Sequence, residues 1–285
     1  MNRLFFGAVL FSVLFFVSCQ KEIDWGLGGG NTTSQLLVKL KSQTGTDTTQ
    51  LEYYYDANKR IIREKTTGIS GGISIDNDLL IYRNSSGIIT STVQKAAALI
   101  AAGIDSVVTR YNYSTASSKY TSSVFDLGIP GFTVTDSAVY TYDAYGRITT
   151  DEHYLQIGGL PIPIPSVLAL KDIYTYSASG SNLTVVSQDA ATTPGGPLSP
   201  VSSQTFTFDS KTNPLIILNE AVLLVRTGFY NANNATKSVV ANTIDPTQDF
   251  TMDYTYKYNS VNKPDSSYGT RTPGGVVTAS KYFYQ

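Results

Sequence analysis

The sequence predicts an all-β fold: a curved antiparallel meander sheet built from hairpin repeats of about 30 residues, with one short helical insert. Three observations predict it. Tyr, Thr, Ser, Val and Ile dominate the composition, with 20 Tyr against 2 Met and 1 Trp, and these residue types favour strands. Aromatic and polar residues alternate in short runs. Each run ends at turn-forming residues, and the pattern recurs along the chain.

The clearest copy of the repeat is YTYDAYGRIT at residues 140–149. Tyr140 and Tyr142 lie two positions apart, so a strand places both rings on one face. Asp143 favours a turn because its side chain can accept a hydrogen bond from the backbone two residues on, and Gly146 tolerates positive φ. One unit is therefore a β-hairpin. The aromatic residues assigned to the position before each turn are Tyr55, Tyr82, Tyr113, Tyr142, Tyr176, Phe208, Tyr230 and Tyr258.

Two inserts interrupt the repeats. Residues 91–106 contain helix formers from Gln94 to Ala102, which predicts a short helix packed over one opening of the sheet and too short to span a membrane. Residues 158–170 carry prolines at alternate positions. Proline cannot donate to a strand ladder, so this insert is predicted to be an apolar loop over the aromatic face.

The N-terminal residues predict export and lipid attachment. A cationic start precedes an apolar run, Leu4 to Val17, of the length of a signal-peptide core. The run ends at Ser18 and Cys19 in a pattern that resembles a bacterial lipobox, which implies acylation of Cys19. This residue is the single cysteine of the chain, so an internal disulfide and a thiolate metal cluster are both excluded.

Gln20, Lys21 and Glu22 resemble the export signal of Bacteroidetes surface lipoproteins; the alternative is a simple polar tether. A Gly-rich stretch follows, which is typical of a flexible spacer. We therefore expect a signal peptide at 1–18, a lipidated Cys19 with a tether at 19–34, and a single β-repeat domain at 35–285.

The charge pattern argues against a nucleic-acid partner. The net charge is −1, only 15% of residues are charged, and no basic stripe is present, so nucleic acid is not an expected partner. No Gly-rich phosphate loop precedes a helix, and no cofactor is expected.

The unit at residues 140–149 resembles the YD repeat of Rhs and teneurin-type proteins, whose core is Tyr-Asp, two residues, then Gly-Arg-Leu/Ile. Tyr142, Asp143, Gly146, Arg147 and Ile148 match this core. The arrangement as a whole is similar to Bacteroidetes lipoproteins of unknown function, some of which have a porin-like curved sheet. The resemblance implies an open or partly closed, porin-like half barrel and an outer-membrane, cell-surface location. It implies no activity.

His153 is the only histidine of the chain. Alternation places it on one strand face with Asp151, a pair that could indicate a metal site or a charge relay. No second histidine completes a ligand set, so we expect a solvated strand residue and no metal site.

Two carboxylate pairs could serve a glycosidase, Asp76 with Asp78 and Asp245 with Asp249. Turn-forming acids are the simpler interpretation. No Gly-x-Ser-x-Gly nucleophile elbow occurs. The chain is therefore predicted to have no catalytic residues and not to be an enzyme.

The recurring rings are expected to be mostly core. A ligand platform that includes Tyr142 and Tyr176 is predicted if the loops at 68–78 and 156–170 leave part of the face open. Separately, Thr48, Ser106 and Ser137 follow aspartates in triplets similar to the Bacteroidetes O-glycosylation sequon.

We therefore expect a lipid-anchored cell-surface β-repeat protein that acts as a non-enzymatic binding or scaffold module. The alternative is a glycan-capturing or glycan-processing accessory of an outer-membrane uptake system. A transmembrane barrel is a third option. Lipid-facing positions would have to be apolar, whereas the positions opposite the rings are Thr141, Thr207, Thr255 and Lys257.

Overall fold

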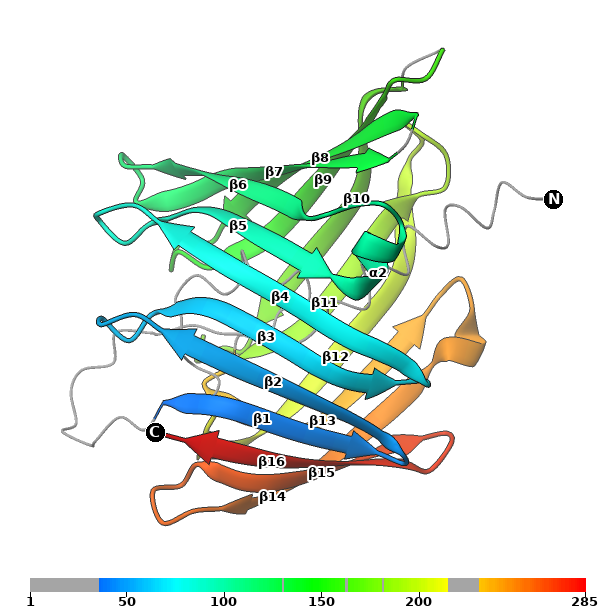
Figure 1. The fold of residues 1–285 in the computed structure, drawn as a ribbon. Helices are drawn as coiled ribbons and strands as arrows, with labels where there is room; N and C mark the ends of the chain where they lie inside the picture. Colours follow the sequence, from blue (N-terminus) through cyan, green and yellow to red (C-terminus); the bar gives the residue numbers. More distant parts are fainter. Residues whose placement is uncertain (1–35, 130, 162–163, 181, 215–230) are drawn as a thin grey trace.

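The computed structural model describes residues 36–129, 131–161, 164–180, 182–214 and 231–285, which form a closed barrel of 16 antiparallel strands (Figure 1). The strands are β1 (Leu37–Thr44), β2 (Asp47–Tyr55), β3 (Ile61–Ser70), β4 (Ile73–Arg83), β5 (Ile89–Ala96), β6 (Val107–Ser114), β7 (Lys119–Ile129), β8 (Phe132–Tyr142), β9 (Ile148–Gly158), β10 (Ile164–Tyr176), β11 (Leu183–Ala191), β12 (Leu198–Thr212), β13 (Asn233–Asn242), β14 (Phe250–Tyr258), β15 (Pro264–Thr272) and β16 (Val276–Tyr284).

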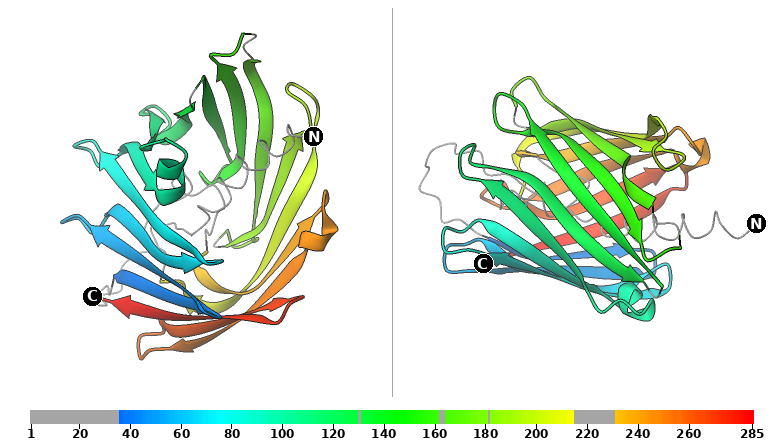
Figure 2. Two further views of the ribbon diagram at one scale, coloured as in Figure 1. Left: turned by 45° about the vertical axis from the view of Figure 1, so that its right-hand side comes forward. Right: turned by 90° about the horizontal axis from the view of Figure 1, so that it is seen from above.

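The barrel closes because the first strand pairs with the last. Every strand pairs with its neighbours in sequence, and β1 pairs with β16, with Leu40 opposite Tyr282. In both views of Figure 2 the sheet curls round until these two strands lie side by side. The predicted all-β antiparallel meander is confirmed, whereas the open or partly closed half barrel is wrong. Closure gives hydrogen-bond partners to the backbone groups that two open edges would expose.

The repeat corresponds to two strands with their two connections. In a meander, alternate connections lie at the same end of the barrel, so the YD-like turns after β2, β4, β6, β8, β10 and β14 share one end. We call it the YD end. The aromatic residue before each turn therefore also recurs at this end.

The turn at Asp143 forms as its side-chain chemistry predicts. The Asp143 Oδ1 accepts the backbone N–H groups of Tyr145 at 2.9 Å and Arg147 at 3.0 Å. The Arg147 Nε donates to Asp143 Oδ2 at 2.5 Å, and the guanidinium lies 4.5 Å from the ring centroid of Tyr176 in the next hairpin. One turn residue thus contacts the following unit.

The degenerate copies keep this geometry with other residues. Asp56 Oδ1 accepts from the N–H groups of Asn58 at 2.8 Å and Arg60 at 2.9 Å. Lys59 and Asn262 hold φ of 62° at the position where Gly146 holds 85°. The turn therefore survives loss of the glycine, at a cost in backbone strain.

Tyrosine hydroxyls bond neighbouring strands to one another near the YD end. The Tyr142 hydroxyl donates to the carbonyl oxygen of Tyr120 at 2.7 Å, and the Tyr176 hydroxyl donates to that of Ile148 at 2.8 Å. The same bond joins Tyr55 to Leu37, Tyr256 to Ala235 and Tyr284 to Pro264. These part-buried hydroxyls donate to backbone carbonyl groups, which explains why tyrosine rather than phenylalanine recurs there.

The repeat alignment is wrong in three units. Tyr230 lies outside the described residues, and residues 233–238 of its unit belong to β13 rather than to a turn. Strand β12 continues past Phe208 to Thr212. The third error is at Tyr82. Tyr82 is 49% exposed and lies on the outer face, because Asn84 begins its turn and Arg83 occupies the position that Tyr142 holds before Asp143. The Arg83 Nη1 donates to the Gly87 carbonyl oxygen at 2.8 Å.

The inner face is apolar near the YD end. Leu37, Ile61, Ile89 and Leu183 are fully buried and pack with rings that include Tyr140. The outer face carries cross-strand ion pairs. They join Lys39 to Glu52, Arg63 to Asp78, Lys65 to Asp76, Arg110 to Asp126, Lys171 to Glu152 and Lys237 to Asp253.

The predicted helical insert differs from the observed structure. The predicted helix at Gln94 to Ala102 is shorter, because β5 continues to Ala96 and only α2 (Ala97–Ala101) is helical, with Leu99 buried. Another helical turn, η1 (Pro246–Gln248), precedes β14. None of the helices in the described part of the chain has the length and apolar character that crossing a membrane requires.

The prediction that two loops cover the aromatic rings is wrong. Residues 68–78 belong to the β3–β4 hairpin, and the described residues of 156–170 belong largely to β9 and β10. Register shifts in the β9–β10 pairing lie between Ile164 and Val167 and between Leu168 and Leu170, the first of them spanning Pro165. The ladder thus accommodates this proline by an irregularity.

Gly146→Val is expected to lower the free energy of unfolding by about 1–3 kcal/mol, because φ at Gly146 is 85° and a β-branched residue is strained there. A Cβ would meet only the end of the Lys119 side chain, with Cε at 3.6 Å and Nζ at 3.8 Å, so the cost is conformational rather than steric. Gly128→Val is the matched control, since Gly128 lies in β7 with open space around it and no positive φ. Equal urea midpoints for the two variants would contradict the prediction.

Candidate functional site

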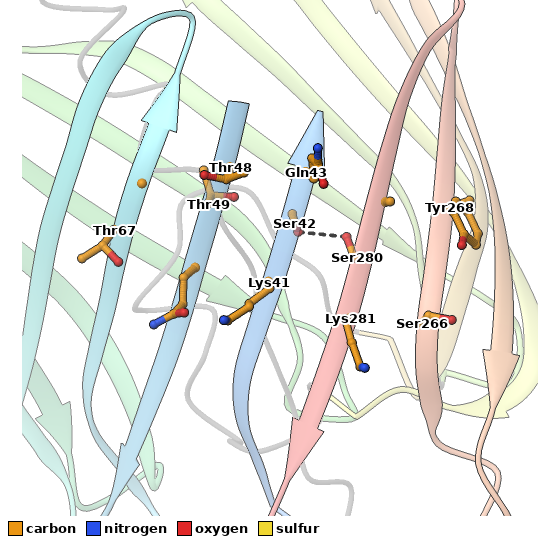
Figure 3. Close-up of a pocket in the computed structure, with 13 residues that line it drawn as sticks. Lys41, Ser42, Gln43, Thr48, Thr49, Thr67, Ser266, Tyr268, Ser280 and Lys281 are labelled. Carbon is orange, nitrogen blue, oxygen red and sulfur yellow. Dashed lines mark hydrogen bonds between the residues drawn. The ribbon is translucent and has the colours of Figure 1, made fainter. Parts of the chain in front are cut away.

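A shallow groove of about 640 Å³ crosses β15, β16, β1, β2 and β3 (Figure 3). Register places its side chains on the outer face. Leu40 and Leu51 pair with each other and belong to the inner core, so the alternate positions Lys41 and Gln50, also paired, point outward. We call this surface the outer groove. Its outward side chains include Lys41, Gln43, Thr48, Gln50, Tyr268 and Lys281.

Two lysines face each other across the seam that closes the barrel. Lys41 lies directly opposite Lys281 in the β1–β16 pairing. Their ammonium groups lie 5.9 Å and 5.7 Å from the ring centroid of Phe283, and neither has an ion pair among the described residues. Directly opposed like charges destabilise a strand pair. Other lysines of the outer face, such as Lys39, Lys171 and Lys237, lie opposite carboxylates, so this pair departs from that pattern.

The groove floor is held by hydroxyl pairs on the inner side of the same seam. The hydroxyls of Ser42 and Ser280 form a hydrogen bond (Figure 3), with their oxygens 2.8 Å apart. Those of Thr44 and Thr278 are 2.7 Å apart. These bonds fix the β1–β16 register and hence the spacing of the two lysines. Tyr268, 47% exposed, presents its ring at the edge of the groove.

A second polar site lies on the inner face of the barrel wall, and we call it the histidine–carboxylate cluster. It consists of His153 and Asp151 on β9, Asp136 on β8 and Asp172 on β10, all at most 4% exposed. The His153 Nδ1 lies 2.9 Å and 3.2 Å from the two carboxylate oxygens of Asp136. Its Nε2 lies 3.2 Å from Asp151 Oδ2.

The carboxylates govern the charge state of the imidazole. Burial alone would lower the pKa of His153, but the charges of Asp151 and Asp136, together with the hydrogen bond to Asp136, outweigh it and raise the pKa to about 10. The imidazole is therefore protonated and positively charged at neutral pH, unless a bound cation displaces the proton from one ring nitrogen. The predicted solvated position of His153 is wrong, whereas its shared face with Asp151 is confirmed.

The aromatic platform predicted at Tyr142 and Tyr176 consists of packed rings. Both hydroxyls donate to backbone carbonyls, as described above. The Lys119 ammonium lies 4.7 Å from the Tyr142 ring centroid, and the Arg147 guanidinium lies over Tyr176. Burial raises the pKa of both phenols well above the ordinary value. Ligand binding by these rings stays a prediction, and the proposals below do not use it.

The other predicted site residues are placed as follows. Thr48 is exposed in the outer groove, Ser106 is half-buried just before β6, and Ser137 is half-buried on β8, so O-glycosylation stays a prediction. Cys19, Gln20, Lys21, Glu22 and the signal peptide at 1–18 lie outside the described residues.

The candidate glycosidase carboxylates have structural partners. Asp78 makes two hydrogen bonds to the Arg63 guanidinium, at 2.7 Å and 2.6 Å, within a strand rather than a turn. Asp245 caps η1, and Asp249 accepts the backbone N–H of Asn242 at 2.6 Å.

The fold and these sites define a closed antiparallel β-barrel with a charged outer face. No family model matches the chain, and no curated protein is significantly similar to it. Among solved structures, the chain is similar to a porin-like protein from Bacteroides uniformis ATCC 8492, with 14% identity, a TM-score of 0.51, and coverage of 87% of this chain and 96% of that one. A porin-like protein from Bacteroides vulgatus ATCC 8482 follows, with 11% identity, a TM-score of 0.49, and coverage of 88% and 99%. The first likeness shows the fold, a porin-like barrel.

Proposed function

We propose that this barrel is a non-enzymatic binding module, held at the outer-membrane surface by an acylated Cys19, and that the outer groove binds an extended anionic ligand of the acidic glycan class. The observation that carries the proposal is the unpaired lysine couple, Lys41 opposite Lys281. Two opposed ammonium groups repel each other in the free protein. A bound anion between them would relieve that repulsion and gain two charge-assisted hydrogen bonds.

The remaining lining favours a hydroxyl-rich ligand. Gln43, Gln50 and Thr48 offer amide and hydroxyl groups that both donate and accept hydrogen bonds. The exposed ring of Tyr268 offers a flat amphipathic surface, of the kind that packs against a sugar ring. The groove runs across several strands, which suits a chain better than a compact small molecule. Its outward side chains contain no acid–base pair, in keeping with binding rather than catalysis.

The charged and polar residues of the outer face favour a barrel that is anchored to the membrane rather than inserted in it. Ion pairs such as Arg63 with Asp78 and Lys171 with Glu152 lie on it, as do Thr141, Thr255 and Lys257. A lysine or arginine facing lipid at the bilayer midplane costs about 2–4 kcal/mol. A band of such residues around the barrel therefore favours an aqueous exterior, with attachment supplied by the lipidated N-terminus.

Lys41→Gln and Lys281→Gln are each expected to weaken binding of an acidic glycan by roughly tenfold, since each removes one charge-assisted contact. The measurement is a glycan array on the intact protein, followed by titration of the best acidic ligand at two salt concentrations. Lys95→Gln is the matched control, because Lys95 is an exposed lysine on β5, outside the groove.

A second readout separates binding from folding. Both groove variants are expected to leave the free energy of unfolding unchanged or to raise it by about 0.2–1 kcal/mol, because like-charge repulsion is removed. Acidic ligands bound equally by the groove variants and by Lys95→Gln would contradict the proposed site. Binding of neutral glycans alone would contradict the proposed ligand class.

A further inference from the structure

Two polar atoms of the histidine–carboxylate cluster have no hydrogen-bond partner. They are Nε2 of His153 and Oδ1 of Asp151, on residues only 2% and 4% exposed. Nε2 lies 3.2 Å from Asp151 Oδ2, yet the angles do not make a hydrogen bond. Buried polar groups are rarely left unsatisfied. These two unsatisfied atoms therefore indicate a binding partner that is not among the side chains of the cluster.

The geometry of the cluster fits a cation. One ligand atom from each of Asp151, His153 and Asp172 can be chosen so that all three lie within 4.8 Å of one another. Neighbouring ligands on metal bonds of about 2.1 Å lie roughly 3.0–3.5 Å apart. The separation of His153 Nε2 from Asp151 Oδ2, close but without hydrogen-bond geometry, matches such a ligand pair.

The strand register independently places like charges together. Asp151 on β9 lies directly opposite Asp172 on β10. Two carboxylates that face each other inside a wall destabilise the strand pair unless positive charge lies between them. A metal ion on Nε2 takes the place of the Nε2 proton, so the ligand form of the cluster is a neutral imidazole with three carboxylates, at a formal charge of −3. A divalent cation would bring this charge to −1.

We propose that the histidine–carboxylate cluster is a binding site for one divalent transition-metal ion of the Zn²⁺ class, with His153 Nε2 and the carboxylates of Asp151 and Asp172 as its ligands. This site is separate from the outer groove, and the proposal does not depend on the function assigned to that groove. The ion would link β9 to β10 across the wall of the barrel.

The surroundings supply the partners that metal ligands require. A ligating imidazole almost always donates its other N–H to a carboxylate or carbonyl, which fixes the ring. Asp136 accepts from Nδ1 of His153 in this way. Gln188 Nε2 donates to Asp172 Oδ1 at 2.9 Å and orients that carboxylate. Asp136 and Gln188 are thus positioning residues of the site.

The donor set selects the class of metal. Imidazole nitrogen suits Zn²⁺ and its transition-metal neighbours, whereas Ca²⁺ takes six to eight oxygen ligands. One nitrogen and two carboxylates leave room for water at the remaining coordination positions. The expectation of no metal site, which relied on the lack of a second histidine, overlooked carboxylates on two adjacent strands.

The test uses the intact protein, treated with a chelator, dialysed and titrated with ZnCl₂ by calorimetry, with CaCl₂ as the comparison. One zinc ion per chain is expected, and no calcium. His153→Gln should abolish zinc binding. Asp136→Asn should weaken it by roughly 10–100-fold. Asp126→Asn, which alters a carboxylate on the outer face, should leave it unchanged. Circular dichroism establishes that each variant is folded.

A second measurement identifies the ligand atom without a variant. His153 is the only histidine, so ¹⁵N-histidine labelling gives the ring signals of this residue alone. Zinc should shift Nε2 strongly and remove its proton, while the Nδ1 proton bonded to Asp136 persists. The proposal is overturned by folded wild-type protein that takes up no zinc, by equal zinc affinity in His153→Gln, or by an Nε2 signal that zinc does not move.

Discussion

Asp136→Ala is expected to lower the free energy of unfolding of the metal-free barrel by about 3–5 kcal/mol, the cost of breaking a buried ion pair by removing one partner. Asp136 is 3% exposed, and both of its carboxylate oxygens lie within 3.2 Å of His153 Nδ1. Alanine would leave the buried imidazole without this bond and open a cavity in β8. Urea unfolding of chelator-treated protein, followed by circular dichroism, measures the loss.

Two further variants separate charge from contact. Asp136→Asn keeps an oxygen that can accept from Nδ1 but loses the charge, so an intermediate loss is expected. Asp126→Ala removes a carboxylate that is 3.7 Å from Arg110, with both side chains more than half exposed. An exposed pair contributes about 0–1 kcal/mol. The interpretation of Asp136 as a buried ionic partner fails if Asp136→Ala costs no more than Asp126→Ala.

The hairpins were predictable because their determinants are local. Asp143 accepts from N–H groups two and four residues ahead, and Gly146 supplies the positive φ of the same turn. Alternation of Tyr140 and Tyr142 set the inner face correctly for the same reason. The error at Tyr82 arose where arginine replaced the aromatic residue and shifted the apparent alignment by one position. A shift of one residue moves a side chain to the other face of a strand.

Closure and both polar sites depend on pairings between distant residues. Nothing in the sequence near Lys41 marks its partner Lys281, because the first and last strands meet only when the sheet has curled through the full barrel. His153 could be paired with Asp151 by alternation alone. Asp136 and Asp172 reach it from β8 and β10, and their positions depend on register shifts within long hairpins. A signal was present: aspartates at inward-facing positions of three successive strands.

Cys19→Ala is expected to move the protein from the membrane fraction to the soluble fraction, or to leave the precursor uncleaved. Cys19 lies outside the described residues; in the sequence it follows the apolar run Leu4 to Val17 in a lipobox-like setting. Each buried CH₂ of an acyl chain contributes about 0.8 kcal/mol, so two or three chains anchor a protein firmly. If the lipid supplies the anchor, as proposed, the outer face, which carries ion pairs such as Arg63 with Asp78, would attach the barrel to the membrane only weakly, and release should be close to complete.

The matched control separates anchoring from surface export. Replacing Lys21 and Glu22 together with alanine should leave acylation and membrane fractionation intact, because the lipobox-like residues are unchanged. It should reduce labelling of intact cells by a membrane-impermeant reagent if Gln20, Lys21 and Glu22 form an export signal. From Cys19 to the start of β1 the chain can span at most roughly 60 Å, enough to hold the barrel clear of the bilayer. Cys19→Ala protein that is processed normally and stays with the membranes would refute the lipid anchor, and the barrel itself would then have to make the membrane contact.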